Sequence, residues 1–202
     1  MYNSFIWDFD GTIVDSYPHI TSAMVKMAER HGIKGTPREM REALEVSFAT
    51  AYDAFHLTKE QIDEFRSYEK DVSLEPQVTP FQKTEHVLKA VLEKGGKNYI
   101  YTHRALESTV YYLEKYDLMK YFSDLITADD GFPWKPDPTA LNYLSEKYGI
   151  DKQSAIMIGD REIDVLSGVN SGITGCLITT KTNKSCAKYI VGDIGDVLEL
   201  LK

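Results

Sequence analysis

Short apolar runs recur along the chain, and several of them end abruptly in polar residues. The first lies in the stretch from Phe5 to Asp15, where an apolar run ends in two carboxylates, Asp8 and Asp10, and a glycine, Gly11. A run of this length that stops at a glycine is typical of a strand buried on both faces, and such strands occur in parallel sheets covered by helices. Similar runs predict further strands over residues 97–102, 125–127, 155–159, 175–179 and 188–191.

Apolar residues at helical spacing fill the intervals between these runs in the second part of the chain. They predict helices over about 87–94, 104–118, 138–148 and 163–171, and a last helix that ends at residue 202. Strands and helices that alternate in this way build a parallel sheet with right-handed crossovers and helices on both faces. The sequence therefore predicts an α/β fold.

The segment after the first strand has a different pattern, because only helical spacing occurs in it. Its apolar stripes predict helices over 18–31, 37–55 and from about 58 onward. We therefore predict two domains. A small α-helical domain at residues 16–78 is inserted after the first strand of a core that consists of residues 1–15 and 79–202.

Polar clusters follow several of the predicted strands. Asp8 and Asp10 follow the first, residues 102–104 the second, and residues 159–164 the fourth, while residues 134–138 form a loop rich in proline. In open α/β sheets, ligands bind and active sites form outside the carboxyl ends of the strands. Since side chains alternate along a strand, Asp8 and Asp10 are expected to point to the same side. Two carboxylates so close repel each other, and a Mg²⁺ ion relieves the repulsion.

These residue types can carry out phosphoryl transfer. Asp8 is the better nucleophile candidate, and Asp10 is expected to protonate the leaving group and later to activate water. Asp160 completes a metal site with Asp8 and the main-chain carbonyl of Asp10.

The phosphoryl oxygens need positive charge and hydrogen-bond donors around them. The Thr102 hydroxyl and the Lys135 ammonium are expected to hold these oxygens. Asp164 lies one helical turn after Asp160 and could orient either Lys135 or a metal-bound water.

The charge of the chain narrows the class of partner. A net charge of −8 and the lack of a basic stripe argue against a nucleic-acid surface and leave a small phosphorylated metabolite as the expected partner. No apolar run is long enough to span a bilayer, and no signal-peptide pattern opens the chain, so no membrane partner is expected. Cys176 and Cys186 are interpreted as reduced thiols of a cytoplasmic protein, which we expect to be a monomer or a weak homodimer.

The residues already named resemble the motifs of the haloacid dehalogenase superfamily, in order and at plausible spacing. The resemblance covers the whole chain and rests on the segment from Asp8 to Asp15, on Thr102, on Lys135 and on Gly159 to Asp164. It implies a Rossmann-like core, Mg²⁺ dependence and an aspartyl-phosphate intermediate. The helical insert is similar to the small cap of phosphoglycolate phosphatase-like and β-phosphoglucomutase-like members, which closes over substrate.

The resemblance also implies which further residues surround the substrate. Gly11 and Thr12 of the first motif are expected to contact it, and Asp15 to support the motif from behind. His103 stands where an Asn is often found in the superfamily. His19, close after the first motif, and His103, beside Thr102, are the two histidines expected to contact substrate.

Other interpretations of the same residues are possible. A calcium loop is excluded, because placing Gly11 at its sixth position puts Ile6 and Tyr17 where oxygen ligands are required. Asp160 and Asp164 could instead be carboxylates at a helix start, and Lys135 an ordinary loop lysine. A phosphomutase would use the same catalytic residues, and a non-catalytic binding protein could have kept the fold.

Overall fold

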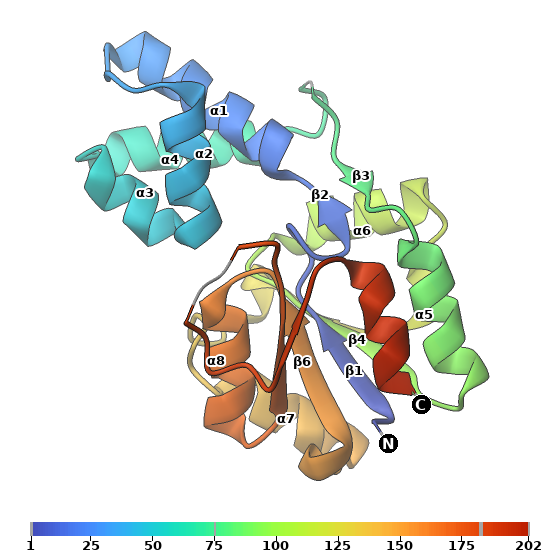
Figure 1. Ribbon diagram of the computed structural model, residues 1–202. Helices are drawn as coiled ribbons and strands as arrows, with labels where there is room; N and C mark the ends of the chain where they lie inside the picture. The colour runs from blue at the N-terminus through green and yellow to red at the C-terminus, as the bar shows by residue number, and fades with distance from the viewer. Residues whose placement is uncertain (1, 75, 182–183, 202) are drawn as a thin grey trace. The chain divides into compact units, whose positions relative to one another are not determined.

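The structure is a computed structural model that describes residues 2–74, 76–181 and 184–201 of the chain. Its central feature is a six-stranded parallel sheet in the order β5-β4-β1-β6-β7-β8. The strands are β1 (Ser4–Trp7), β4 (Lys97–Tyr101), β5 (Phe122–Ile126), β6 (Ala155–Gly159), β7 (Thr174–Ile178) and β8 (Tyr189–Val191). The predicted parallel sheet is confirmed, with the first strand between β4 and β6 (Figure 1).

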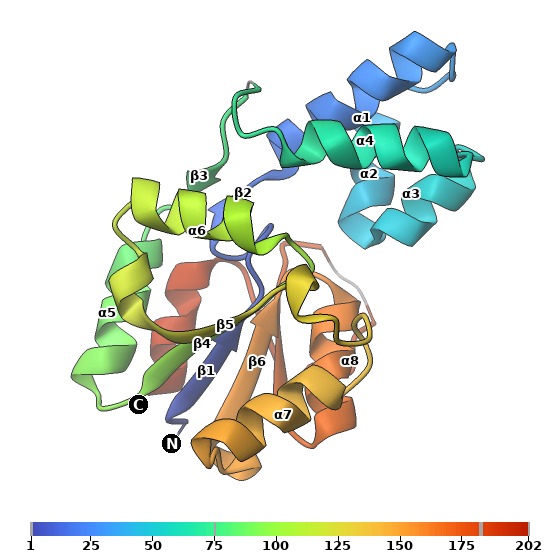
Figure 2. The same ribbon diagram turned by 180° about the vertical axis from the view of Figure 1, so that it is seen from behind.

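Helices cover both faces of this sheet, as predicted. On one face lie α5 (Thr84–Glu93) and the 3-10 helix η4 (Ile194–Leu201), and on the other lie α7 (Thr139–Tyr148) and α8 (Glu162–Ser171) (Figures 1 and 2). The unit also contains α6 (Leu106–Lys115) and the 3-10 turns η1 (Met119–Tyr121), η2 (Ala128–Asp130) and η3 (Lys152–Ser154). The last predicted helix therefore has 3-10 geometry, and its expected end at residue 202 lies outside the described residues.

Successive side chains of β1 pack against opposite faces of the sheet. Ile6 belongs to a buried cluster with Tyr99, Met157 and Leu144 of α7. On the other face, the Trp7 indole N–H donates to the side-chain oxygen of Asn98 at 2.9 Å, and the Asn98 amide donates to the main-chain carbonyl of Leu88 in α5 at 3.0 Å. All four residues of β1 are buried, because a central strand is covered from both sides.

The parallel register aligns the ends of three strands. Trp7 is paired with Ile100 of β4 and with Ile158 of β6. The residues that follow these strands therefore emerge at one edge of the sheet, and they include Asp8, Thr102 and Asp160.

A second compact unit of the chain is helical. The chain divides into Met1–Val14 with Pro80–Lys202, and Asp15–Thr79. The helices of the second unit are α1 (Tyr17–His31), α2 (Pro37–Val46), α3 (Phe48–Ala54) and α4 (Lys59–Lys70), around a core that includes Met24, Met27, Leu44 and Phe65. The short strands β2 (Val14–Asp15) and β3 (Thr79–Pro80) pair where the chain passes from one unit to the other.

The prediction of one helix over 37–55 is wrong. Ser47 has an extended backbone, with φ −170° and ψ 160°, and separates α2 from α3. Its hydroxyl accepts a hydrogen bond from the Thr50 main-chain N–H at 2.9 Å and so caps the second helix. The apolar stripe continues across the break because both helices pack against the same core.

Two further expectations concern the chain as a whole. Among the described residues, no helix is both long and apolar enough to cross a membrane. Cys176 is buried, Cys186 is exposed, and both are free thiols.

Candidate active site

Asp8 is the buried centre of the polar edge of the sheet. Its main-chain N–H donates to the carbonyl of Ile158 at 2.8 Å, which continues the pairing with β6 one residue beyond the strand. Its side chain is fully buried. One carboxylate oxygen, Oδ1, accepts from Lys135, whereas the buried Oδ2 has no hydrogen-bond partner among the described residues. A buried carboxylate oxygen in this state is a candidate for a metal or a substrate atom.

Lys135 holds this carboxylate in place. Its Nζ lies 2.7 Å from Asp8 Oδ1, 2.9 Å from Asp164 Oδ1 and 2.7 Å from the carbonyl oxygen of Tyr101. An ammonium group has three protons, and each has an acceptor here. Burial lowers the pKa of Lys135, but the carboxylates of Asp164 and Asp8 outweigh burial and raise it. Lys135 is therefore a fixed buried cation.

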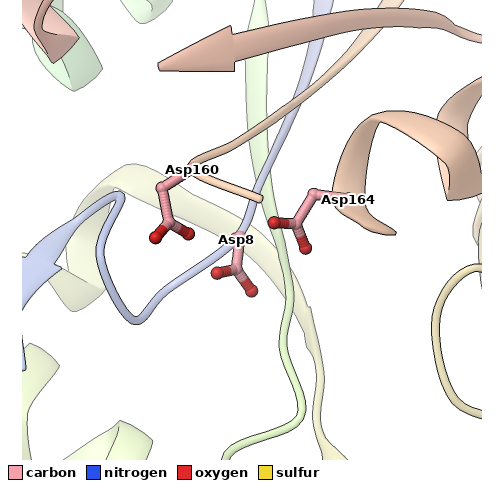
Figure 3. Close-up of side chains that lie close together, drawn as sticks. All are labelled: Asp8, Asp160 and Asp164. Atoms are coloured by element: carbon pink, nitrogen blue, oxygen red, sulfur yellow. The ribbon is translucent and has the colours of Figure 1, made fainter. Parts of the chain in front are cut away.

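Asp160 and Asp164 complete a cluster of carboxylates around Asp8. One oxygen of each of these three residues lies within 4.8 Å of the others, and the close-up shows the side chains converging (Figure 3). Three carboxylate oxygens are the hard donors that a divalent cation such as Mg²⁺ prefers. Asp8 Oδ2 accepts no hydrogen bond from the described residues, and this donor set fits the predicted cation.

Gly159 makes room for one member of this cluster. A Cβ atom on Gly159 would lie 2.3 Å from the Cβ of Asp164, far inside van der Waals contact. The Asp164 carboxylate can therefore fold back over the end of β6, where Oδ2 accepts from the Arg161 main-chain N–H at 3.1 Å and begins α8.

Arg161 lies among the carboxylates and was not predicted as a site residue. Its guanidinium nitrogens lie 3.7 Å from Asp8 Oδ2, 3.8 Å from Asp160 Oδ1 and 3.8 Å from Asp164 Oδ2. With Lys135 it brings two cations to three carboxylates, so one negative charge is left over at the cluster. Its position between Asp160 and Asp164 in the sequence was the signal that could have identified it as a site residue.

The pKa of Asp8 reflects this environment. Burial raises it, and the neighbouring Asp164 carboxylate raises it further. The cations Lys135 and Arg161 oppose both effects, and the resulting pKa is about 6. The Asp8 carboxylate is therefore ionised above about pH 6, and only then is it a nucleophile.

The expectation that Asp8 and Asp10 point to the same side of one strand is wrong. β1 ends at Trp7, and Asp10 lies in the following turn, where it forms a bridge with Val14. Gly11, at φ +78°, lets the chain turn back here, and its N–H donates to the carbonyl of Val14 at 2.8 Å. The Asp10 side chain consequently lies outside the carboxylate cluster.

Arg104 is the partner of Asp10. Its Nη1 lies 2.7 Å from Asp10 Oδ1, and its guanidinium is buried within 6.0 Å of the Phe9 ring centre and 5.3 Å of that of Tyr112. Arg104 belongs to the polar cluster after β4, but the sequence assigned it no role. The pair fixes one carboxylate oxygen of Asp10, whose side chain is 17% exposed.

Thr102 and Thr12 are both buried at this edge. The Thr102 main-chain N–H donates to Ile126, and its hydroxyl oxygen accepts from the Arg104 main-chain N–H at 3.0 Å. That hydroxyl keeps its own proton for donation. Thr12 Oγ1 has no hydrogen-bond partner among the described residues.

The two histidines expected to contact substrate have different surroundings. His103 Nε2 accepts from the Lys135 main-chain N–H at 2.8 Å, so this nitrogen is engaged with the protein. His19 is buried in the helical unit, with Nε2 3.0 Å from the carbonyl oxygen of Glu69. Asp15 also belongs to the helical unit, in β2. The structure therefore brings together Asp8, Lys135, Asp160 and Asp164, with Thr102 and Asp10 nearby at the same sheet edge.

Comparisons with known proteins agree with this geometry. Residues 5–178 match the family model described as "Haloacid dehalogenase-like hydrolase". The chain is 26% identical over 180 residues to the "Pyrophosphatase PpaX" of Halalkalibacterium halodurans, which covers 87% of this chain and 83% of that protein. It is 26% identical over 179 residues to the "Phosphoglycolate phosphatase" of Vibrio vulnificus, covering 82% of this chain and 78% of that one.

A solved structure gives a similar result. The crystal structure of a hydrolase from Streptococcus pneumoniae is 30% identical to the chain, with a TM-score of 0.62, and the match covers 88% of this chain and 93% of that one. The family match over residues 5–178 includes both Asp8 and Asp160.

Proposed function

The chain belongs to the haloacid dehalogenase-like hydrolase family and is a phosphohydrolase, and we propose that it hydrolyses a small phosphate monoester through a phosphorylated Asp8. The observation that carries the proposal is the state of Asp8. Its Oδ1 is tied to Lys135, while its buried Oδ2 has no hydrogen-bond partner among the described residues. A carboxylate that is fixed by one oxygen and accepts no hydrogen bond at the other is prepared to attack an electrophile.

The proposed reaction has two displacements. In the first, an Asp8 oxygen bonds to phosphorus, the bond from phosphorus to the leaving oxygen breaks, and Asp10 gives that oxygen a proton. In the second, Asp10 takes a proton from water, the water oxygen bonds to phosphorus, and the bond to Asp8 breaks. The sum is ester plus water giving alcohol plus phosphate, with both carboxyl groups restored.

The cations of the site stabilise charge in this scheme. Thr102 would donate to a phosphoryl oxygen, Lys135 would supply positive charge beside it, and Asp164 keeps Lys135 in position. Asp8, Asp160 and the main-chain carbonyl of Asp10 would hold Mg²⁺. When bound, Mg²⁺ would neutralise negative charge on the phosphoryl group. The excess negative charge of the carboxylate cluster supports this assignment.

The helical unit has its own part in the proposal. We assign residues 16–78 the role of a cap that selects the leaving group, and residues 1–15 and 79–202 that of the catalytic core. Gly11 and Thr12, in the turn after Asp8, are proposed to contact substrate. The protein is proposed to act in the cytoplasm as a monomer or weak homodimer.

A phosphate-release assay over a panel of phosphate esters, with pyrophosphate added, tests the proposal. The panel starts with phosphoglycolate and pyrophosphate, the compounds in the names of the two relatives, and adds sugar phosphates and an aryl phosphate. We expect hydrolysis with Mg²⁺ present and its loss with EDTA.

Two variants identify the nucleophile. Asp8→Asn is expected to lose at least about 10³-fold in kcat, since the carboxylate oxygen that forms the intermediate is removed. Asp117→Asn is the matched control, because Asp117 is an exposed turn residue at φ 55°, which Asn tolerates. Full Mg²⁺-dependent hydrolysis by Asp8→Asn would refute the assignment. Accumulation of an isomeric sugar phosphate in place of free phosphate would identify a mutase.

A further inference from the structure

His103 makes a hydrogen bond that fixes its protonation. Its Nε2 lies 2.8 Å from the main-chain nitrogen of Lys135. A main-chain N–H can only donate, so Nε2 must be the unprotonated nitrogen, and the proton of the neutral ring is on Nδ1. A protonated imidazole has no acceptor and cannot make this contact.

Aromatic residues hold the ring in this orientation. The centre of the Trp134 ring lies 4.3 Å from that of His103, at an interplanar angle of 75°, and the Tyr101 ring lies 6.1 Å away at 84°. Both are edge-to-face arrangements, which aromatic rings prefer. The same three residues line a small cavity of about 190 Å³, and Trp134 is 58% exposed. The His103 ring is therefore fixed on its aromatic side and close to solvent.

Lys135 is consequently held at both of its ends, by the last residue of β4 and by the segment that follows β4. Its main-chain N–H donates to His103, and its ammonium donates to the carbonyl oxygen of Tyr101. The ammonium then reaches Asp8 and Asp164 with its two other protons. A shift of the Lys135 main chain would move the ammonium away from all three acceptors.

We propose that His103 is a positioning residue that, in its neutral form, sets the place of Lys135 at the carboxylate cluster. The proposal deepens the phosphohydrolase function proposed above and rests on it for its kinetic consequence. It makes the placement of Lys135 dependent on pH. The contact forms when His103 is neutral and is lost as the pH falls and the ring takes up a second proton.

The titratable groups around the ring have partners of their own. Burial raises the pKa of Tyr101 to about 12, so Tyr101 stays neutral, and its hydroxyl donates to the carbonyl of Pro133. The Lys135 ammonium is turned towards its carboxylates. The acidic side chains of the segment from residue 127 to residue 139 accept main-chain N–H groups: Asp129 from Leu106, Asp130 from Thr127 and Asp137 from Thr139.

Two substitutions distinguish the effect of the hydrogen-bond acceptor on His103 from the effect of the volume of its ring. His103→Gln places an amide oxygen near the position of Nε2 and has no titrating group, whereas His103→Leu keeps volume but has no acceptor. We expect His103→Leu to lower kcat/KM about tenfold to hundredfold, as a displaced catalytic group does, and His103→Gln to stay within about threefold of wild type. Activity of His103→Gln should also fall less steeply than that of wild type as the pH is lowered.

A spectroscopic measurement tests the contact without relying on activity. Nitrogen-15 NMR of the imidazole is expected to show the proton of neutral His103 on Nδ1. Fluorescence of Trp134 should change as His103 is protonated, and this change should be absent in His103→Gln. Trp134→Phe identifies the signal, because the other tryptophan, Trp7, is buried in β1.

The outcomes separate this proposal from the proposed function. A neutral ring with its proton on Nε2 would overturn the positioning role, as would equal kcat/KM values for His103→Leu and wild type. If no ester is hydrolysed by wild type, the phosphohydrolase function fails, while the NMR result still decides whether His103 holds Lys135.

Discussion

Arg104 binds the carboxylate of Asp10 through a buried guanidinium, whose Nη1 lies 2.7 Å from Asp10 Oδ1. The two residues are 94 positions apart in the chain, and the sheet brings them together because β4 lies beside β1. The group proposed as acid and base is thus fixed by one oxygen, like Asp8. Arg104 is buried, and it acts on the site by holding Asp10.

The first prediction concerns this pair. Arg104→Met should reduce kcat about tenfold or more, because Asp10 loses the donor that orients it. It should also lower the free energy of unfolding by roughly 3 kcal/mol, the cost typical of removing one partner of a buried ion pair. Arg104→Lys should recover part of both. Urea denaturation and steady-state kinetics measure the two effects, and a double-mutant cycle with Asp10→Asn isolates the pair. A coupling energy near zero would show that the contact has no energetic role.

The second prediction concerns pH and metal binding. Asp8 has a pKa raised to about 6, so below that pH the nucleophile is protonated and activity should fall. In metal-free protein, stability changes with pH in the opposite direction to activity. The folded state binds this proton more tightly than the unfolded state does, so ionised Asp8 destabilises the fold in full above about pH 6. This destabilisation decreases as the pH falls below 6 and is lost near the ordinary pKa of 3.8.

Mg²⁺ reverses that balance, since it binds ionised Asp8 in the folded protein. The rise in Tm on adding Mg²⁺ should therefore be larger at pH 8 than at pH 5. Thermal unfolding with Mg²⁺ and with EDTA at both values measures it. Asp8→Asn should show a much smaller rise at pH 8. A Tm shift of equal size at the two pH values would contradict the assignment of Asp8 as a ligand.

The third prediction concerns Gly159. Replacing it with Ala places a methyl group 2.3 Å from the Cβ of Asp164, so the carboxylate must move away from Lys135. We expect a loss of about 1–3 kcal/mol in stability, typical of overpacking, and a loss of about 10²-fold in kcat/KM from the displaced lysine. Gly192→Ala is a suitable control, because its methyl group would meet only the side chain of Asp196. Unchanged activity in Gly159→Ala would mean that Asp164 does not need its present position.

The fourth prediction concerns Lys135. Lys135→Met removes the cation between Asp8 and Asp164, so the two carboxylates face each other and the pKa of Asp8 should rise further. Activity should fall by about 10²–10³-fold, and the fall should be larger at pH 6 than at pH 8. Lys135→Arg should not restore activity, because the buried space accommodates an ammonium with three acceptors. Lys89→Met, at an exposed helix position, is the control.

The sequence predicts the buried strands well because a single physical cause governs them. β6 occupies the predicted residues 155–159, since its apolar run is bounded by a glycine and every residue in it is buried. The break between the two helices at Ser47 cannot be predicted from apolar spacing. Both helices on either side of it pack against one core, so the apolar stripe does not stop where the hydrogen bonds do.

Site residues divide in a similar way. Asp8, Asp160 and Asp164 could be found because each follows a strand or begins a helix in a recognisable pattern. The roles of Arg104, Arg161 and His103 could not, because each depends on a partner supplied by a different strand or loop. The placement of Asp8 and Asp10 on one strand was wrong for a related reason: β1 ends at Trp7, and the turn that follows it, not the alternation of a strand, directs both side chains.

The place of β1 in the sheet also bears on how the protein is made. β1 leaves the ribosome first, yet its two neighbours, β4 and β6, begin at residues 97 and 155. A nascent chain that ends before β6 therefore carries the fully buried strand β1 without its second neighbour. Asp8 meets Lys135 only after residue 135 has emerged, and the carboxylate cluster is complete only after residue 164. The site of Asp8 is thus completed long after Asp8 itself is synthesised, and a chain that ends before β6 would expose β1 as a site for aggregation.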